Sequence, residues 1–419
     1  MAIKKMGTDR TINSATGCFP VPPLAARIFA IAGAAGHEAR IVGGAVRDWL
    51  VGREIGDIDM AVAAPIDIVA ALLRDSGLRV IDTGLDHGTV TVVEDGRHLE
   101  LTQTRVDVET DGRRAVVAFS DDWAADAARR DFTINTLYID SAGRLEDPLG
   151  GQADLEAGVL RFVGAATQRV EEDALRMLRY CRFLPHFGTA GTDGEALAAL
   201  TDKAGLAAML SGERVAGEVE RMLRGPGAGV SVRLLQDTGL AAAALGVTLD
   251  AGRLTPEIDQ AVESAIGAGG PAWLVRLAVI MRPGDAAGLA ARLRLSRRHG
   301  RVLAALDADK TGNDAESLTG DSWQRAAWSL TRAEIIPAAR LVVASARAAR
   351  QIDRAHLARV AAWTPPDFPL AGADLLSQGV DSGSSLGEML RAAEHEWVAR
   401  DFGPTRADLI AFLGLDTTD

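Results

Sequence analysis

The sequence predicts an α+β domain followed by a long region built only from helices. Through the first third of the chain, short strand-forming runs alternate with short helical segments, and beyond Asp147-Pro148 apolar residues recur at helical spacing. Alanine, leucine and arginine are abundant and aromatic residues make up only 5% of the chain, which favours helices over strands. A chain of 419 residues exceeds one ordinary core, so we expect several domains.

The first domain is expected to hold a small mixed sheet with a few helices. Strands are predicted at 39–42, 57–62, 89–94, 98–104, 137–140 and 144–146. Asp95-Gly96 separates two of these strands and is typical of a tight hairpin turn. Helices are predicted at 24–35, 45–51 and 66–76. The first is apolar but short and contains Arg27, so we expect it in a core rather than in a membrane.

Clusters of glycine and proline divide the helical region. They stand at 225–227, 267–271, 283–284 and 365–366. We therefore expect four segments, with boundaries at 1–147, 148–225, 226–345 and 346–419.

Charge and cysteine content restrict the class of protein. The net charge of −12 argues mildly against nucleic-acid binding, because phosphate contacts need a positive surface. Arginines nevertheless cluster at 176–182 and 292–301, as either a basic stripe or solvated helix faces. Two cysteines are too few for a disulfide framework, and the N-terminal residues make a poor signal peptide. We expect a soluble cytoplasmic protein with no membrane contact and no stable protein partner.

Three acidic residues could bind a catalytic metal. Asp57 and Asp59 are two apart, so on a strand their carboxylates project from the same face. Such a pair repels unless a cation lies between the two groups, and oxygen-only ligands suit Mg²⁺. Glu100, between Leu99 and Leu101, is the best candidate for a third acid across the sheet. An acidic turn is the structural alternative, because Asp-x-Asp by itself is common.

A glycine pair upstream could bind phosphate. Gly43-Gly44 lies between a predicted strand and helix, where backbone N–H groups can approach phosphate oxygens. Arg47, one helical turn further on, can reach the same triphosphate. The run is neither a Walker loop, since no Lys-Ser/Thr follows, nor a complete dinucleotide fingerprint, since the third glycine is missing. A plain tight turn is the alternative.

A predicted helix from Val170 to about Pro185 carries charged residues on one side. Its apolar residues gather within about a third of the helical circumference. The other side carries residues spaced by three: Asp173, Arg176, Arg179 and Arg182. An acid and an arginine in fixed positions can mimic a Watson–Crick edge, whereas a solvent-exposed arginine face is the alternative.

Together these motifs resemble the class II tRNA nucleotidyltransferases, or CCA-adding enzymes, and the related bacterial poly(A) polymerases. The glycine pair with Arg47-Asp48 and the two aspartates is similar to the signature of polymerase β-type nucleotidyltransferases. Arg129 to Asn135 (RRDFTIN) matches the second class II signature nearly letter for letter, and Asp147 to Asp154 resembles the segment that follows it. The resemblance is strong over residues 1–225 and weak beyond.

The resemblance implies a fold, an activity and a set of site residues. The fold would be a polymerase β-type nucleotidyltransferase head followed by an all-α neck, body and tail. The activity would be Mg²⁺-dependent addition of C, C and A to tRNA 3′ ends from CTP and ATP, with the tail binding tRNA. Asp173 and Arg176 would form a protein template for cytosine and adenine, completed by Arg130, Arg179 and Arg182.

Some positions depart from the family pattern. Thr136 replaces the usual alanine, and Asp381-Ser-Gly replaces a Pro-Gly pair. Glu213-Arg214 and Glu218 resemble the last family signature and are expected to support the neck.

Functions other than CCA addition stay open. They are a poly(A) polymerase or a partial CC- or A-adding enzyme, a noncatalytic RNA-binding protein, and, least favoured, a nicotinamide-dependent oxidoreductase.

Overall fold

The fold is taken from a computed structural model of the chain. It describes residues 18–85, 88–110, 115–225, 227–267, 271–308, 313–332 and 336–415. The chain divides into two compact units, of which the first comprises Met1–Leu210 with Asp237–Ala244 and the second Ser211–Gln236 with Leu245–Asp419. The predicted division into four segments is finer than this and stays a prediction.

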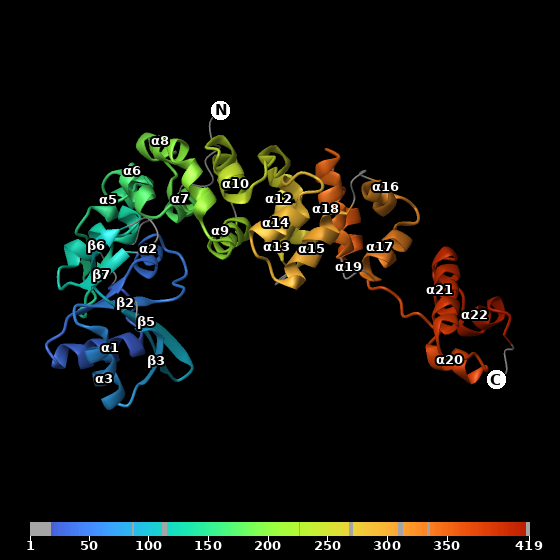
Figure 1. The fold of residues 1–419 in the computed structure, drawn as a ribbon, viewed down its shortest axis with the longest axis horizontal. Coiled ribbons are helices and arrows are strands. Elements are labelled where there is room, and N and C mark those ends of the chain that lie inside the picture. The colour runs from blue at the N-terminus through green and yellow to red at the C-terminus, as the bar shows by residue number, and fades with distance from the viewer. Residues whose placement is uncertain are drawn as a thin grey trace. The chain divides into compact units, whose positions relative to one another are not determined.

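A seven-stranded mixed sheet forms the centre of the first unit (Figure 1). Its order is β3-β4-β5-β2-β1-β8-β9. The bounds are β1 Ala39–Val42, β2 Asp59–Val62, β3 Arg79–Gly84, β4 Thr89–Glu94, β5 Arg97–Gln103, β8 Tyr138–Ile139 and β9 Leu145–Glu146. β2 and β5 are parallel, whereas β1 is antiparallel to both β2 and β8. The α+β head predicted from the sequence is therefore confirmed.

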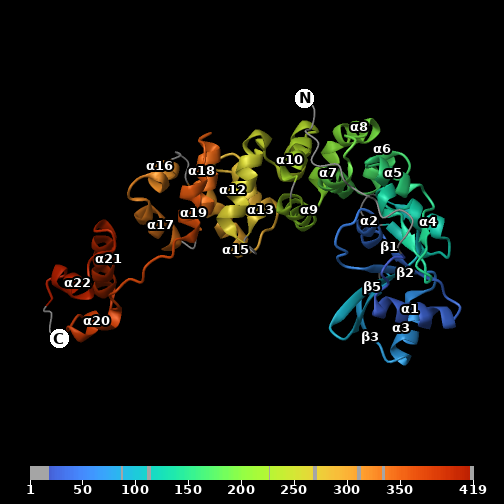
Figure 2. The same ribbon diagram turned by 180° about the vertical axis from the view of Figure 1, so that it is seen from behind.

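Helices pack against the buried residues of the central strands. All four residues of β1 are buried. The helices α1 (Pro23–Ala34) and α3 (Ile66–Asp75) pack against one another and against the sheet, as both ribbon views show (Figures 1 and 2). Val42 and Tyr138 also pack with Ala127 of α4 (Trp123–Ala128). The buried face of α1 confirms the expectation of a core helix.

The β4–β5 hairpin forms where Asp95-Gly96 predicted it. Both turn residues have positive φ, 49° for Asp95 and 74° for Gly96, as a tight two-residue hairpin requires. The strand β3 and the two-stranded sheet of β6 (Arg105–Thr110) and β7 (Ala115–Phe119) were not predicted. β3 lacks an alternating apolar pattern, and most of its residues are exposed.

Helices take over after the sheet, in agreement with the sequence. In the first unit the helices that follow the sheet are α5 Gly151–Ala157, α6 Ala166–Glu172, α7 Leu175–Phe187 and α8 Gly194–Asp202, whereas α2 Gly44–Leu50 lies between β1 and β2. The single helix predicted from Val170 to about Pro185 is wrong, because the chain breaks at Asp173. That residue is extended, with φ −150° and ψ 104°, and it separates α6 from α7.

The second unit is helical throughout its named elements. The bounds are α9 Gly212–Arg224, α10 Ala228–Asp237, α12 Pro256–Ile266, α13 Ala272–Ile280, α14 Ala286–Arg292, α15 Arg297–Asp307, α16 Asn313–Thr319, α17 Trp323–Arg332, α18 Pro337–Arg347, α19 Arg354–Ala362, α20 Gly372–Ser377, α21 Ser384–Ala399 and α22 Arg406–Phe412. The short α11 (Leu240–Leu245) lies mostly in the stretch that returns to the first unit.

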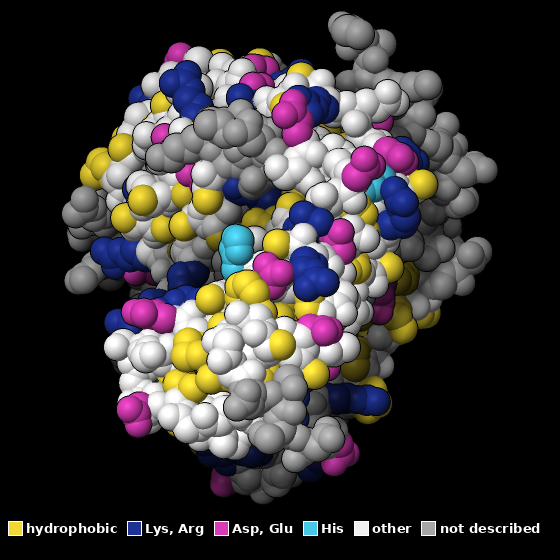
Figure 3. Space-filling model, turned by 90° about the vertical axis from the view of Figure 1, so that its right-hand side faces the viewer, with side chains coloured by type: hydrophobic (Ala, Val, Ile, Leu, Met, Phe, Trp, Pro, Cys, Tyr) yellow, Lys and Arg dark blue, Asp and Glu magenta, His cyan; other side chains and the backbone are white. Residues whose placement is uncertain are grey.

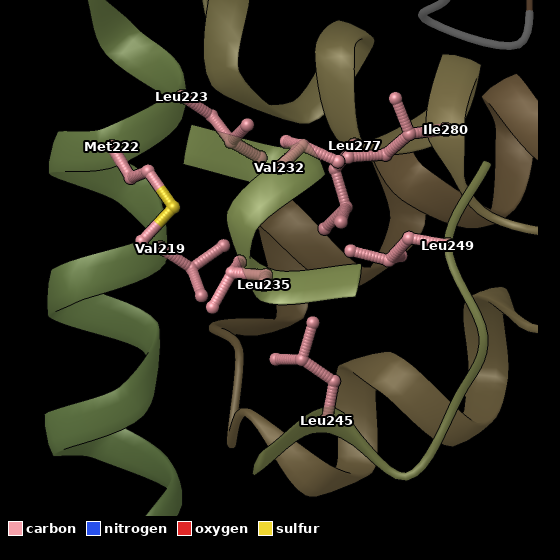
Figure 4. A pocket seen from close by; sticks show the side chains of 9 residues that line it. All are labelled: Val219, Met222, Leu223, Val232, Leu235, Leu245, Leu249, Leu277 and Ile280. Atoms are coloured by element: carbon pink, nitrogen blue, oxygen red, sulfur yellow. The ribbon is translucent and has the colours of Figure 1, made fainter. Parts of the chain in front are cut away.

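Apolar side chains of α9, α10 and α13 meet within the second unit. Leu223 of α9, Val232 of α10 and Leu277 of α13 line a small cavity whose labelled walls are all hydrophobic (Figure 4). Such a lining offers no polar group to orient a ligand, so this cavity is part of the core. None of the described helices is long and apolar enough to cross a membrane.

Candidate active site

The acidic residues come together at the start of β2. Asp59 is the first residue of that strand and pairs in register with Glu100 of the parallel strand β5. Leu99 and Leu101 are buried while Glu100 is exposed, as the alternation predicted. Asp57 lies in the bend before β2 rather than on the strand, so the expectation that strand pleating aligns the two aspartates is wrong. Their charges nevertheless interact.

Asp59 lies in a strongly negative environment. Although it is exposed at the end of its strand, loss of surrounding water raises the pKa of its carboxyl to about 6. The Glu100 charge raises this pKa further, Arg130 lowers it, and Asp57 makes a smaller contribution to the rise. A carboxylate whose ionisation is opposed by other carboxylates gains most from a nearby cation.

The donors present suit Mg²⁺ better than a transition metal. No group of three or more His, Cys, Asp or Glu side chains within the described ranges is gathered closely enough to hold a metal alone. Mg²⁺ usually binds one or two protein carboxylates and completes its shell with water and substrate phosphate. Asp57 and Asp59 fit that pattern.

The glycine turn brings backbone close to an arginine. Gly43 precedes α2 with φ 71°, a left-handed conformation that favours glycine. A Cβ atom on Gly43 would lie 3.4 Å from Nη1 of Arg130. Gly44 begins the helix, so both predicted glycines stand at the turn between β1 and α2.

Arg47, which the sequence predicts beside the triphosphate, has a buried side chain. Its Nη1 donates a 2.7 Å hydrogen bond to Oδ1 of Asn135, and its Nε and Nη2 donate to Asp48. Its guanidinium lies 4.3 Å from the ring centre of Phe187 and 5.0 Å from that of Phe183, both in α7. Burial lowers the pKa of Arg47 while Asp48 opposes that effect. Arg47 thus ties α2 to α7.

Arg130 is held by a carboxylate that the sequence motifs did not single out. Asp126 accepts hydrogen bonds from Arg129, from Arg130 at 3.0 Å, and from the hydroxyl of Tyr138. Burial alone would raise the pKa of Asp126, but the two guanidinium groups hold it below its ordinary value. Nη1 of Arg130 also donates to the backbone oxygen of Asn135 at 3.4 Å.

The break at Asp173 places the two predicted base-reading residues at the start of α7. Oδ1 of Asp173 accepts from the backbone N–H of Leu175 at 3.1 Å. Nη1 of Arg176 donates to the carboxylate of Glu172 and to the backbone oxygen of Arg169. Its Nη2 donates to the backbone oxygen of Arg129. Three of the five N–H donors of its guanidinium are used in these bonds, which fix its plane.

The other two arginines of α7 lie along the same helix. Nε of Arg179 donates a 2.6 Å hydrogen bond to Oδ2 of Asp131, and the guanidinium of Arg182 lies 4.1 Å from the ring centre of Phe183. Asp131 is buried, and its Oδ1 accepts from Asn135 Nδ2. The sequence indicated Asp131 and Asn135 only as letters of the RRDFTIN motif, and that motif was the signal that pointed to them.

Comparison with known proteins assigns the family. Residues 39–161 match the family described as "Poly A polymerase head domain", and residues 193–246 match "Probable RNA and SrmB- binding site of polymerase A". The chain is 31% identical over 384 residues to "CCA tRNA nucleotidyltransferase 1, mitochondrial" of Mus musculus, covering 90% of this chain and 86% of that protein. The chain belongs to the CCA tRNA nucleotidyltransferase family.

Further relatives agree with this assignment. The "CCA-adding enzyme" of Geobacillus kaustophilus (strain HTA426) is 42% identical over 207 residues, which is 49% of this chain and 50% of that protein. The crystal structure of the Bacillus stearothermophilus CCA-adding enzyme in complex with CTP matches with a TM-score of 0.70 and 27% identity, over 93% of this chain and 96% of that one. A nicotinamide-dependent oxidoreductase is therefore excluded, and this nucleotidyltransferase has the head predicted from its first motifs.

Proposed function

We propose that this nucleotidyltransferase adds C, C and A in turn to the 3′ end of tRNA, from CTP and ATP. The observation that carries the proposal is the register of Asp59 with Glu100, one strand away from the Gly43-Gly44 turn that follows β1. Carboxylates for a metal and backbone N–H groups for phosphate then flank a single reacting centre.

The reaction is a nucleotidyl transfer. The terminal hydroxyl oxygen of the RNA attacks the α-phosphorus of the nucleotide and loses its proton to water. The bond between the α-phosphorus and the bridging oxygen breaks, and pyrophosphate leaves. Asp57 and Asp59 would hold Mg²⁺, which would supply Lewis-acid stabilisation of the phosphoryl oxygens. Glu100 makes the local field more negative and so favours cation binding at Asp59.

The base is read by α7. Cytosine and adenine both present an exocyclic amine beside a ring-nitrogen acceptor. Asp173 would accept from the amine and Arg176 would donate to the ring nitrogen, with the guanidinium plane already fixed by the carbonyls of Arg169 and Arg129. Arg179 and Arg182 lie further along the helix and, with Arg130, complete the nucleotide pocket.

The helical segments would hold the RNA. We assign base reading to residues 148–225 and tRNA binding to the tail, 346–419, with the arginines of α15 as a further contact. Arg297, Arg298 and Arg301 are exposed, whereas Arg294 pairs with Glu213 of α9. Figure 3 shows Lys and Arg side chains interspersed with Asp and Glu on the face drawn. Because the net charge is −12, we expect RNA phosphates to be bound locally, by exposed arginines such as those of α15.

A comparison of two labelled nucleotides tests the proposal. The purified enzyme is given Mg²⁺ and tRNA lacking its last three nucleotides, with labelled CTP or labelled ATP. We expect two C residues and then one A, each dependent on Asp59. Repeated addition of A without C would identify a poly(A) polymerase instead, and C addition that stops before A would identify a CC-adding enzyme.

We also place the enzyme in the cytoplasm, on the basis of its low cysteine content. Cell fractionation with an antibody to the chain would test this, and recovery in an organelle or membrane fraction would contradict it.

A further inference from the structure

Asn135 lies at the junction of three of the arginines around the site. It ends a short 3₁₀ turn, η2 (Thr133–Asn135), and is only 7% exposed. Its side-chain oxygen accepts from Arg47 at 2.7 Å, and its side-chain nitrogen donates to Asp131 at 2.9 Å. Its backbone oxygen accepts from Arg130 at 3.4 Å.

These bonds form a continuous chain from α2 to α7. At one end Asp48 and Asn135 hold Arg47, in the helix that begins at the phosphate-binding turn. At the other end Asp131 receives Asn135 Nδ2 on one oxygen and Arg179 Nε, at 2.6 Å, on the other. Asn135 is thus the link between the helix proposed to hold the triphosphate and the helix proposed to read the base.

Only an amide satisfies both of its neighbours. The guanidinium of Arg47 can only donate, and the ionised carboxylate of Asp131 can only accept. Asn135 offers an acceptor and a donor side by side, and its partners fix which atom faces which. An acid at this position would keep the bond to Arg47 but would place a second carboxylate against Asp131.

We propose that Asn135 is a positioning residue that holds the base-reading helix α7 in register with the phosphate-binding turn. It touches neither nucleotide nor metal and acts through Arg47 and through the Asp131–Arg179 pair. The inference rests on the proposed function, because the two ends are defined by the nucleotide that they bind.

The test measures binding at the two ends separately. Equilibrium constants for inorganic triphosphate, CMP and CTP, each with Mg²⁺, are measured by calorimetry on the full chain without tRNA. The Asn135→Asp protein keeps the acceptor toward Arg47 and loses the donor toward Asp131. We expect its Kd for CMP to rise about tenfold or more, and its Kd for inorganic triphosphate to stay within about twofold of wild type.

The same split should appear in catalysis. For CTP and ATP the KM of Asn135→Asp should rise by about the factor seen for CMP, and discrimination against UTP should narrow. Gln103→Glu is the matched control, because it is also an amide-to-acid exchange in the first unit. The side-chain oxygen of Gln103 accepts a hydrogen bond from the backbone N–H of Ile66, which a glutamate can also accept, so the three binding constants of this variant should be unchanged.

A second variant covers the case in which Asn135→Asp does not fold. Asp131→Asn removes the charge that faces Arg179 and should produce the same selective loss of CMP binding. If both variants fold, the double variant should lose no more CMP affinity than the worse single one, because both interrupt the same chain of bonds from Asn135 through Asp131 to Arg179.

Other results would overturn the proposal. Equal changes in the triphosphate and CMP constants would show a general structural role, and unchanged constants in folded Asn135→Asp or Asp131→Asn would show no role at all. If the wild-type protein binds CTP but adds neither C nor A to tRNA, the proposed function fails. The separate effects of the variants on the Kd for CMP and the Kd for inorganic triphosphate can still be measured in that case.

Discussion

Asp59, the first residue of β2, is paired in register with Glu100 of the neighbouring parallel strand. Adjacent parallel strands therefore bring two carboxylates to one point of the sheet, and Asp57 adds a third charge from the preceding bend. The carboxylates repel one another unless a cation lies between them. Changes at this site should therefore alter catalysis, metal binding and stability, each of which can be measured.

Removing the Asp59 charge should abolish catalysis without abolishing RNA binding. Asp59→Asn keeps the shape of the side chain but weakens the metal site, and we expect the rate of C addition to fall by about 10³-fold or more. Asp67→Asn is the control, since Asp67 is an exposed acid in the first turn of α3. A comparable rate in Asp59→Asn would place the active site elsewhere. Gel-shift titration should show nearly unchanged affinity for tRNA.

The same carboxyl should make metal binding depend on pH. Because its pKa is raised to about 6, protons compete with Mg²⁺ below that pH. The Mg²⁺ concentration for half-maximal activity should therefore rise steeply between pH 7 and pH 5, by up to about tenfold per unit below the pKa. Magnesium titrations at several pH values check this. A flat profile would argue against Asp59 as a ligand.

The metal-free protein should show the opposite dependence in its stability. A carboxyl whose folded pKa lies above its ordinary value of 3.8 favours the folded state at low pH. This stabilisation is fully present below pH 3.8 and is lost as the pH rises through about 6. Urea unfolding of the wild type and of Asp59→Asn, both in the presence of a chelator, checks this. The pH-dependent contribution should be present in the wild type and missing in the variant.

The Asp126 cluster should be important for stability. Asp126 is 1% exposed and accepts from Arg129, Arg130 and Tyr138, so Asp126→Ala leaves two partly buried guanidinium groups without their acceptor. We expect a loss of about 3 kcal/mol in the free energy of unfolding, against about 1 kcal/mol for Tyr138→Phe. Urea unfolding measures both, and equal losses would contradict the central role of the carboxylate in this cluster.

The Asp126 cluster should also lose its contribution to the free energy of unfolding at low pH. The folded pKa of Asp126 lies below its ordinary value of 3.8, so its contribution to stability is complete above that pH and is lost as the pH falls through the folded pKa. Acid unfolding of wild type and Asp126→Ala should therefore converge at low pH. A difference that persists unchanged at the lowest pH would show that the carboxylate charge is not responsible.

Base selection should depend on Asp173. Uracil and guanine present a carbonyl and a ring N–H where cytosine and adenine present an amine and an acceptor, and each mismatched buried group costs about 1–3 kcal/mol. Asp173→Ala should lower the rates of CTP and ATP incorporation and bring them closer to the rates for UTP and GTP. Asp57→Ala should lower the rates for all four nucleotides without changing their ratios. Measuring the four nucleotides with both variants decides this. Unchanged discrimination in Asp173→Ala would remove Asp173 from base reading.

The arginines near α15 should contribute to the salt dependence of RNA binding. Replacing Arg292, Arg297 and Arg298 by glutamine should lower the slope of log affinity against log salt by about 0.7 to 0.9 for each RNA phosphate that the variant no longer neutralises. Filter binding of tRNA over a range of salt concentrations measures the slope. An unchanged slope would place the phosphate-binding residues on another surface.

The sequence by itself determined the features that depend on neighbouring residues. β1 occupies the predicted residues, the Asp95-Gly96 turn has the positive φ values that its composition requires, and Glu100 faces away from buried Leu99 and Leu101. Short-range periodicity and turn chemistry suffice for these. The motifs around Gly43, Asp57 and Arg129 also identified the family, because their order along the chain is itself a pattern.

Only the tertiary structure decided where the long side chains end. Arg47 and Asn135 are 88 positions apart, and their hydrogen bond forms only because α2 and the RRDFTIN segment meet in space. The sequence could place Arg47 near phosphate but could not show that Phe183 and Phe187 bury it. The break at Asp173 and the hydrogen bonds of Arg176 to the backbone oxygens of Arg169 and Arg129 are likewise found only in the folded chain. An arginine has five donors and a flexible stem, so its partners are set by the folded surroundings and not by its neighbours in the chain.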